Sequence, residues 1–229
     1  MIASNADHIE PRTEVPAGAL KMRLSSQSSD PAGLADVYQE NINIAIWQRE
    51  LSAGLRDRVD EFLASNASFK SAMTVSPRSA PAAVSDALGA VDDCALCGDI
   101  SELVEMFCCL LGVERAGLRL GVLNAAMCPK FHVDRVPCRL VTTYQGCGTE
   151  WLQHNAVDRT KLGPGSRGKS DQESGLFKTP GDIQRLSCGD VALLKGELWE
   201  GNADAGLVHR SPEVSAGELR LLLTLDVSG

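Results

Sequence analysis

The sequence contains no apolar run that approaches the ~18 residues needed by a membrane-spanning helix. Its first thirty residues are polar and interrupted by proline and glycine, and they lack the apolar core of a secretion signal. We therefore expect a cytoplasmic protein without a membrane anchor. In that compartment the eight cysteines stay mostly reduced, so their even number does not indicate disulfides.

Positive charge is also in short supply. The chain carries 22 Lys and Arg residues against 30 Asp and Glu residues, which gives a formal net charge of −8 at pH 7. A surface that binds phosphate groups in general needs a net positive potential. The balance therefore argues against general nucleic-acid binding and against anionic membranes as partners, although it is compatible with a local basic pocket.

Histidine is scarce as well, because the whole sequence contains four. His8 lies in the polar N-terminal stretch, and His154 follows a predicted strand at a position that we expect on the surface. His132 and His209 both lie in strand-like segments. These two residues are therefore the first candidates for a metal or catalytic centre.

The order of the predicted elements divides the chain into three parts. Residues 1–36 are rich in Ser, Pro, Ala and Asp, which predicts a flexible tail. Residues 37–112 predict a mainly helical N-terminal extension. Residues 113–229 contain strand-like runs separated by Gly, Pro and Asp, which predicts a jelly-roll domain that binds a metal. The expected fold is mainly β: a double-stranded β-helix (jelly roll) with an N-terminal α-helical extension.

Hydrophobic spacing gives the positions of the individual elements. Strands are expected at Ile42–Trp47, Arg115–Asn124, Val136–Tyr144, Asp190–Gly196, Ala205–Ser211 and Glu218–Val227, and helices at Leu51–Ser65, from about Pro81 to Gly89, and at Asp99–Gly112. Asp99 is the expected N-cap of the last helix, Glu102 completes a capping box, and Gly112 is the stop signal. The polar, glycine-rich segment Asp158–Asp182 predicts a lid over the site, a binding loop or disorder.

The segment CPKFHVDRVPCRLVTTY, Cys128–Tyr144, places two costly polar side chains, His132 and Asp134, two positions apart. Alternate residues of a strand share a face, so both side chains point to the same side. In a jelly roll, the strand that contains His209 can return to face them. Two histidines and one carboxylate leave coordination positions open, as non-haem Fe(II) oxygenases require. We therefore predict His132, Asp134 and His209 as metal ligands and as the catalytic centre, with a hydrogen-bonded polar cluster as the alternative.

Arg220 lies amid apolar residues on the predicted strand that follows His209. A guanidinium in such a place is costly unless it is paired. Two interpretations stay open. Arg220 binds the carboxylate of an anionic cosubstrate such as a 2-oxo acid, or it forms a structural salt bridge with Asp226 or Glu218.

Side chains on the strand after His132 are predicted to complete the pocket. Thr142 and Tyr144 share strand parity with His132 if Pro137 introduces no bulge, so we expect both to line the cofactor site. Further basic residues lie in the strand-like runs or directly after the proposed ligands: Arg135, Arg139, Lys195 and Arg210. Positive charge thus gathers near the predicted site of an acidic protein, which suits an anionic cosubstrate.

The same residues are compatible with two other functions. His132, Asp134 and His209 also suit Zn²⁺, because the order of metal affinities does not favour iron. A non-catalytic, cupin-like protein that stores or passes zinc is therefore the main alternative to an oxygenase. A zinc hydrolase with Glu150 or Asp190 as its base is a third hypothesis.

The cysteines allow a separate hypothesis. Cys94 and Cys97 form a CxxC motif, and Cys108 and Cys109 follow on the next predicted helix. Together they supply enough thiolates for structural zinc, although adjacent helical residues point about 100° apart. A redox pair and reduced, partly buried thiols are the other interpretations, and the role of the motif stays open. Cys128 precedes His132 closely enough to approach the metal.

The layout resembles the 2-oxoglutarate/Fe(II)-dependent oxygenase superfamily. The matching residues are His132-Val133-Asp134, His209 and Arg220, and GDVALLKG resembles the strand that precedes the distal histidine in such enzymes. The resemblance spans about Ala116 to Asp226 and implies Fe(II) and 2-oxoglutarate as cofactors. It also implies that Arg220 binds the distal carboxylate of the oxoacid. Leu222 departs from the pattern, because the superfamily often has a small polar residue there.

The segments FHVDRVPCRLVTTYQGCGTEWL, GDVALLKGELWEG and HRSP with RLLLTLD are also similar to the bacterial family named domain of unknown function eighteen twenty-six. This similarity covers the chain from about Ile42 onward. The family has no assigned activity, and its members are often encoded beside zinc-homeostasis genes. The resemblance therefore implies a role in metal biology and a link to zinc-homeostasis proteins. The sequence does not identify the substrate, which is a small molecule or a protein.

Overall fold

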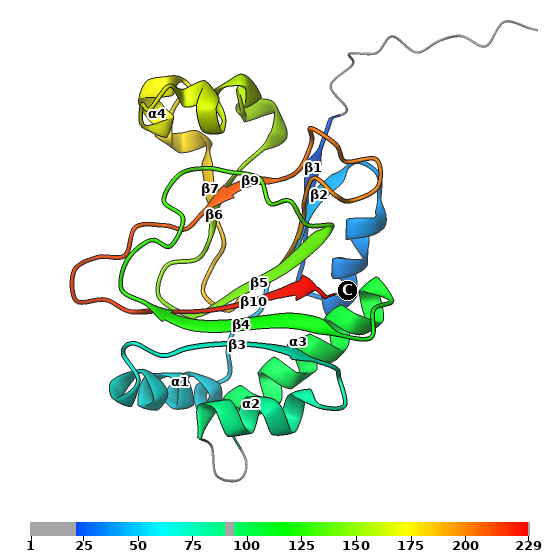
Figure 1. Ribbon diagram of the computed structural model, residues 1–229, viewed down its shortest axis with the longest axis vertical. Coiled ribbons are helices and arrows are strands. Elements are labelled where there is room, and N and C mark those ends of the chain that lie inside the picture. The colour runs from blue at the N-terminus through cyan, green and yellow to red at the C-terminus, as the bar shows by residue number, and fades with distance from the viewer. Residues whose placement is uncertain (1–21, 90–93, 229) are drawn as a thin grey trace, which may run out of the picture.

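The computed structural model describes residues 22–89 and 94–228 (Figure 1). The strands are β1 (Leu24–Ser28), β2 (Ile42–Trp47), β3 (Lys70–Val75), β4 (Ala116–Leu123), β5 (Cys138–Gln145), β6 (Glu150–Leu152), β7 (Ile183–Arg185), β8 (Val191–Lys195), β9 (Val208–Arg210) and β10 (Arg220–Val227). The α-helices are α1 (Ala53–Ser65), α2 (Ala80–Leu88), α3 (Ala95–Leu111) and α4 (Asp171–Ser174), and the 3-10 helices are η1 (Pro31–Tyr38), η2 (His154–Ala156), η3 (Arg159–Lys161), η4 (Gly163–Ser166) and η5 (Pro180–Asp182). None of the helices in these two ranges has the length and apolar character needed to cross a membrane.

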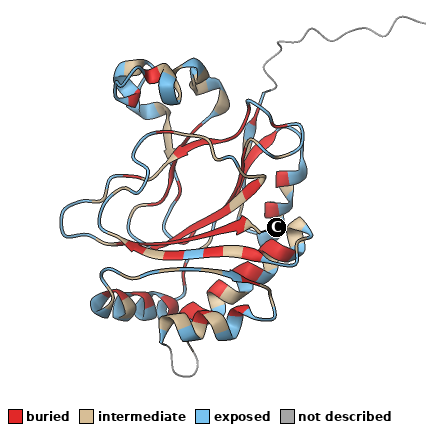
Figure 2. Cartoon of the chain, in the orientation of Figure 1, coloured by how far each residue is buried: buried red, intermediate tan, exposed pale blue. Residues whose placement is uncertain are grey.

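A large mixed sheet forms the centre of the protein, in the order β1-β2-β8-β5-β10-β4-β3. Side chains alternate between its faces, as the alternating burial along β4 shows (Figure 2). Leu118, Leu140, Leu193 and Leu223 point to one face and join the core beneath the helices. The opposite face packs against a small sheet in the order β7-β6-β9 (Figure 1).

From β4 onward the chain crosses repeatedly between the two sheets. β4, β5, β8 and β10 lie in the large sheet, whereas β6, β7 and β9 form the small one. His132 extends the small sheet through an isolated bridge to His209 on β9. A chain that crosses between two facing sheets in this order is a jelly roll. The predicted double-stranded β-helix is therefore confirmed.

The N-terminal residues are part of this sandwich rather than a separate extension. β2 lies between β1 and β8, and β3 extends the large sheet beyond β4, so the predicted boundary at residue 112 does not separate two layers. The prediction of a flexible tail is wrong for residues 22–36, because β1 pairs with β2 and Asp30 caps η1. Leu34 and Val37 of η1 are buried, which holds this segment against the sheet. Residues 1–21 of that predicted tail lie outside the described residues.

Three helices cover the outer face of the large sheet (Figure 1). Ser52 caps α1 by accepting a hydrogen bond from the Leu55 N–H. The buried residues of α1, Leu55, Val59 and Leu63, recur at the predicted four-residue spacing. The predicted α2 and α3 are also present, and Gly112 ends α3 in the left-handed conformation, with φ +63°.

The start of α3 differs from the prediction. Cys94 is the N-cap, and its Sγ accepts a hydrogen bond from the Cys97 N–H at 3.2 Å. Asp99 therefore lies inside the helix. Its carboxylate accepts two hydrogen bonds from Arg49 and one from the Tyr144 O–H at 2.7 Å. A largely buried salt bridge, rather than a capping box, explains the acid at this position.

The segment 158–182 forms short helical turns on the outer face of the small sheet (Figure 1). Its Leu176 and Phe177 pack with Phe131 and with Val208 of β9. Neighbouring residues of a strand point to opposite faces, so the adjacent His209 points inward, away from this segment. The segment therefore packs behind the small sheet and does not form the predicted lid over the site.

Candidate metal centre

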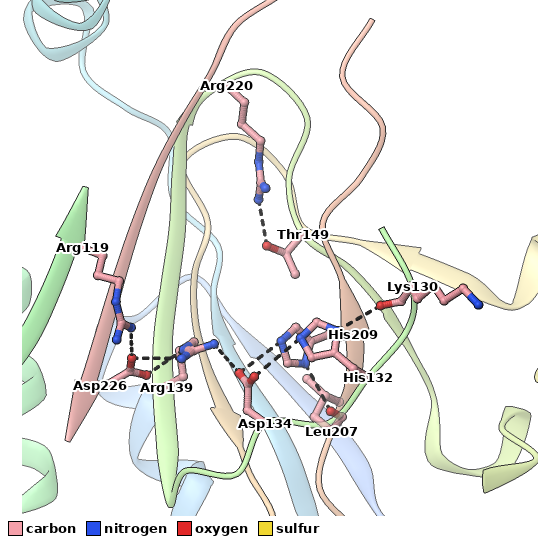
Figure 3. A network of polar contacts seen from close by, with 10 residues as sticks. All are labelled: Arg119, Lys130, His132, Asp134, Arg139, Thr149, Leu207, His209, Arg220 and Asp226. Atoms are coloured by element: carbon pink, nitrogen blue, oxygen red, sulfur yellow. Dashed lines mark hydrogen bonds and ion pairs between the residues drawn. The ribbon is translucent and has the colours of Figure 1, made fainter. Parts of the chain in front are cut away.

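Backbone pairing brings His132 and His209 together. The N–H of each donates to the carbonyl oxygen of the other at 3.0 Å, and the ring centroids are 4.7 Å apart. His209 lies on β9, whereas His132 lies in an extended segment outside the regular strands. Asp134 follows in the same segment and points toward both rings (Figure 3). The structure thus brings the three predicted ligands to one place.

One donor atom from each of the three residues lies within 4.8 Å of the others. The His209 Nε2 is 3.3 Å from Oδ2 of Asp134, and the His132 Nε2 is 3.6 Å from Oδ1. The Nδ1 of His132 donates to the Lys130 carbonyl at 3.0 Å, and that of His209 donates to the Leu207 carbonyl at 3.2 Å. Because a carbonyl can only accept, each Nε2 is left to face Asp134 as a ligand. The hydrogen bond to Asp134 raises the pKa of His132, which shows that the cluster favours positive charge. This donor set fits a divalent cation.

An arginine ties Asp134 to the large sheet. Arg139 of β5 donates to Asp134 through Nη1 and to Asp226 of β10 through Nε at 2.7 Å and Nη2 at 2.9 Å. Arg119 of β4 also donates to Asp226 (Figure 3). Burial alone would raise the pKa of Asp134, but hydrogen bonds to the two histidines and the nearby positive charges outweigh it and hold the pKa well below its usual range. The carboxylate is therefore ionised and able to serve as a ligand.

Arg220 is 1% exposed, and its guanidinium points from β10 toward the histidine pair (Figure 3). Its Nη2 donates to Oγ1 of Thr143 at 3.1 Å and of Thr149 at 2.9 Å. Its Nε is buried and has no hydrogen-bond partner among the described residues. Asp226 is bound by the other arginines, and Arg220 forms no salt bridge in the described part of the chain. Burial lowers the pKa of Arg220 to about 10. The unused Nε and the missing counter-charge fit an anionic ligand.

Thr142 and Tyr144 are on the other face of β5, so their prediction as pocket residues is wrong. Tyr144 lies in the core beneath the helices, with its O–H on Asp99, and Thr142 is fully buried. The prediction extended strand parity from His132 through residues 135–137, but the chain bends there. The bend changes which face each residue of β5 occupies, and Arg139, Val141 and Thr143 face the centre instead.

A small pocket between the sheets adjoins the histidines. Its lining includes Met127, Cys128, Val141, Thr149, Leu194 and Leu222. The sequence does not single out Thr143 and Thr149, because threonine is common in strands and nothing in the sequence pairs either residue with Arg220. In the sequence Arg139 stands out only as a basic residue in a strand, and its position between two carboxylates follows from the pairing of β5 with β10.

Glu150 and Asp190 do not offer a free base at the centre. Glu150 is 4% exposed and forms salt bridges with Arg185 and Arg210. Burial would raise the pKa of Glu150, but these arginines lower it below its ordinary value. Asp190 accepts a hydrogen bond from the Ser187 N–H at 2.7 Å, and burial raises its pKa. Neither carboxylate lines the pocket at the histidines, so neither is placed to act as the base that the hydrolase hypothesis requires.

The cysteines do not assemble a zinc site in residues 22–89 and 94–228. Cys94 caps α3, and burial, followed by hydrogen bonding to Cys94, raises the pKa of Cys97 to about 12. Cys108 is buried, whereas Cys109 is exposed. His154 is half-buried rather than a surface residue, and its Nε2 has no partner within the described chain.

A jelly roll that encloses a His-Asp-His cluster, with a buried arginine on its last strand, defines this chain as a jelly-roll protein with a candidate metal centre. The chain belongs to the family described as "Protein of unknown function (DUF1826)", whose model matches residues 28–226. No curated protein matches the sequence.

Several solved structures are similar at low identity. The dioxygenase for auxin oxidation from rice is 12% identical, with a TM-score of 0.47 over 90% of this chain and 82% of that one. A prolyl-4-hydroxylase from Pseudomonas putida is 12% identical, with a TM-score of 0.43 over 86% and 98%. HygX from Streptomyces hygroscopicus, with nickel and 2-oxoglutarate bound, is 13% identical, with a TM-score of 0.38 over 80% and 81%. Similarity at this level assigns no activity, and the fold assignment rests on the strand order.

Proposed function

We propose that the protein is a non-haem Fe(II)- and 2-oxoglutarate-dependent oxygenase. The observation that carries the proposal is the guanidinium of Arg220, which is buried, faces the metal centre and has no carboxylate partner among the described residues. An unpaired charge in such a place lowers stability unless a ligand neutralises it. The distal carboxylate of a 2-oxo diacid is an anion of the right chemistry to pair with an arginine.

Under this proposal, His132, Asp134 and His209 hold the metal. Bound Fe(II) and 2-oxoglutarate supply oxidation by O₂, in which one oxygen atom enters succinate, with loss of CO₂, and the other enters a substrate C–H bond. The protein contributes orientation. The carbonyls of Lys130 and Leu207 fix both imidazole rings, so each Nε2 is directed to the same point.

Arg220 and two threonines hold the oxoacid. The hydroxyls of Thr143 and Thr149 accept hydrogen bonds from Arg220 and keep their own protons available for a carboxylate oxygen. Leu222 stands where related enzymes often have a small polar residue. In this chain the neighbouring strand and the following turn provide the hydroxyls that Leu222 lacks.

Anaerobic loading with Fe(II) followed by 2-oxoglutarate tests the proposal. We expect a charge-transfer absorbance when the oxoacid chelates the metal, and succinate when O₂ is admitted. Arg220→Met should abolish both at moderate 2-oxoglutarate concentration. Arg185→Met is the matched control, because Arg185 pairs with Glu150 and does not line the pocket. The proposal fails if Fe(II)-loaded wild-type protein neither binds nor decarboxylates 2-oxoglutarate.

Metal binding without oxidation is the second candidate, in keeping with a role in zinc homeostasis. It is favoured by the donor set, because two imidazoles and a carboxylate also bind Zn²⁺. It predicts tight Zn²⁺ binding, no succinate, and unchanged metal affinity in Arg220→Met. Titration with Zn²⁺ and Fe(II) beside the succinate assay separates the two candidates.

A further inference from the structure

We propose that the metal pocket continues into a shelf on the large sheet that binds the substrate, and that this substrate is a small anionic amphiphile such as a medium-chain carboxylate. The shelf is the groove whose lining includes Lys70, Ala72, Arg119, Gly121, Met127 and Leu222. The chemistry at the metal rests on the proposed oxygenase function, whereas binding at the shelf can be measured independently of it.

The shelf is continuous with the metal pocket. Met127, Leu222 and Thr224 line both. Met127 lies in the loop that leads to the histidine segment, and it is 60% exposed at the junction. Leu222 and Thr224 alternate with Leu221 and Leu223, which point to the helical core. A ligand on the shelf therefore reaches the centre along one face of the sheet.

Strand register sets the length of the ligand. Lys70 of β3 pairs with Gly121 of β4, and Gly121 pairs with Leu222 of β10. These residues form a row across the sheet, so Lys70 lies two strand spacings, about 10 Å, from Leu222 at the mouth of the metal pocket. An anion held at Lys70 must therefore carry a chain about as long as that of octanoate to place a C–H bond at the centre.

Gly121 keeps the middle of this row open. A Cβ at this position would meet nothing closer than 3.9 Å, and Gly121 does not have a positive φ. Neither space nor backbone conformation therefore requires glycine, although glycine inside a strand weakens the sheet. The missing side chain leaves a trough between Lys70 and Leu222 in which an alkyl chain can lie against the backbone.

Charge complementarity selects an anion. Two cations, Lys70 and Arg119, line the shelf, and none of the described residues that line it is acidic. This contrasts with the net charge of −8 for the whole chain. Arg119 already donates to Asp226, whereas Lys70 forms no ion pair in the described part of the chain. Lys70 is thus the anchor for the carboxylate, and the apolar floor takes the chain.

Isothermal titration of the purified protein with butanoate, hexanoate, octanoate and decanoate tests the shelf. Affinity should rise about fourfold for each added methylene as far as octanoate, because each one leaves water for an apolar surface, and should then level off. Octan-1-ol should bind more weakly than octanoate. Absence of binding, or the same affinity across the series, overturns the proposal.

Variants locate the bound chain. Gly121→Val fills the trough and should reduce octanoate affinity at least tenfold, while the thermal midpoint is kept or raised because valine favours strands. Gly117→Val changes the same strand and face outside the shelf, and it should leave octanoate affinity unchanged. Lys70→Met should weaken binding of octanoate but not of octan-1-ol. Octanoate binding that survives Gly121→Val unchanged overturns the proposal.

Arg220→Met distinguishes the shelf from the oxoacid site. Octanoate affinity should be unchanged in this variant, and its loss would place the carboxylate at Arg220 and overturn the shelf. The succinate assay gives an independent outcome for the oxygenase proposal. If the alkanoates bind as expected and no succinate forms, the shelf is retained and the oxygenase proposal fails. If succinate forms but no alkanoate binds, the shelf alone fails.

Discussion

Arg220→Met is expected to change the free energy of unfolding by no more than about 1 kcal/mol, although Arg220 is among the most buried side chains of the fold. Its guanidinium has been removed from water without gaining a carboxylate. Burial accordingly lowers its pKa from 12.5 to about 10. A shift of that size corresponds to a penalty of about 3 kcal/mol on the charged form.

Two hydrogen bonds offset this penalty. The Arg220 Nη2 donates to the hydroxyls of Thr143 and Thr149 at 3.1 and 2.9 Å. A bond from a charged donor contributes about 1.5 kcal/mol, so together they contribute about 3 kcal/mol. The two terms nearly cancel. Methionine, which has an unbranched apolar side chain, should therefore leave the stability of the ligand-free protein almost unchanged.

Urea unfolding without 2-oxoglutarate measures this effect, and Arg139→Met is the matched control on the neighbouring strand. Arg139 contacts both Asp134 and Asp226, and its removal leaves the largely buried Asp134 without an arginine and Asp226 with Arg119 alone. We expect that substitution to cost about 3 kcal/mol. A loss of about 3 kcal/mol or more in Arg220→Met as well would mean that Arg220 supports the fold. The inference from Arg220 to an oxoacid ligand would then be refuted.

Three other substitutions examine parts of the fold outside the metal centre. Asp99→Asn leaves the guanidinium of Arg49 without its carboxylate and should lower the free energy of unfolding by about 3 kcal/mol, with metal affinity unchanged by titration. Burial, followed by the charge of Arg23, lowers the pKa of Lys195 in the folded protein from 10.5 to about 8. Between these two pH values the unfolded chain therefore binds more protons than the folded protein does. The stability of the wild type relative to Lys195→Met, measured by urea unfolding, should therefore rise across that range by up to about 3 kcal/mol; a constant difference would contradict this. Cys94→Ser should keep both the zinc content, measured by elemental analysis, and the stability, because serine is a good N-cap and no thiolate cluster forms among the described residues.

Strands with a strong hydrophobic pattern were predictable from the sequence, and the edge strands were not. The predicted Ile42–Trp47 matches β2, and the predicted Glu218–Val227 begins only slightly before β10. In contrast, β1 is the polar run LSSQS, and β3 is KSAMTV, in which only Val75 is buried. An edge strand is held by hydrogen bonds to one neighbour and needs little apolar surface. Its sequence therefore carries a weak signal.

The metal centre was predictable because its residue types are rare and closely spaced. Four histidines in the chain leave few ways to build such a site, and Arg220 is conspicuous among leucines. The direction of side chains on β5 was not predictable in the same way, because it depends on the bend at residues 135–137. Thr143 becomes a partner of Arg220 only through the tertiary arrangement of β5 and β10, which a sequence without structural context does not specify.

Asp226→Asn is expected to weaken metal binding about tenfold, although Asp226 is not a proposed ligand. Arg139 contacts Asp226 through Nε and Nη2 and contacts Asp134 through Nη1. Without the charge of Asp226, Arg139 depends on Asp134 alone for its counter-charge and competes with the cation for that carboxylate. Arg119→Met removes another partner of Asp226 but keeps the acid, so it should retain the wild-type affinity. Titration with Zn²⁺ measures both variants, and an unchanged affinity in Asp226→Asn would mean that Arg139 does not compete with the metal for Asp134.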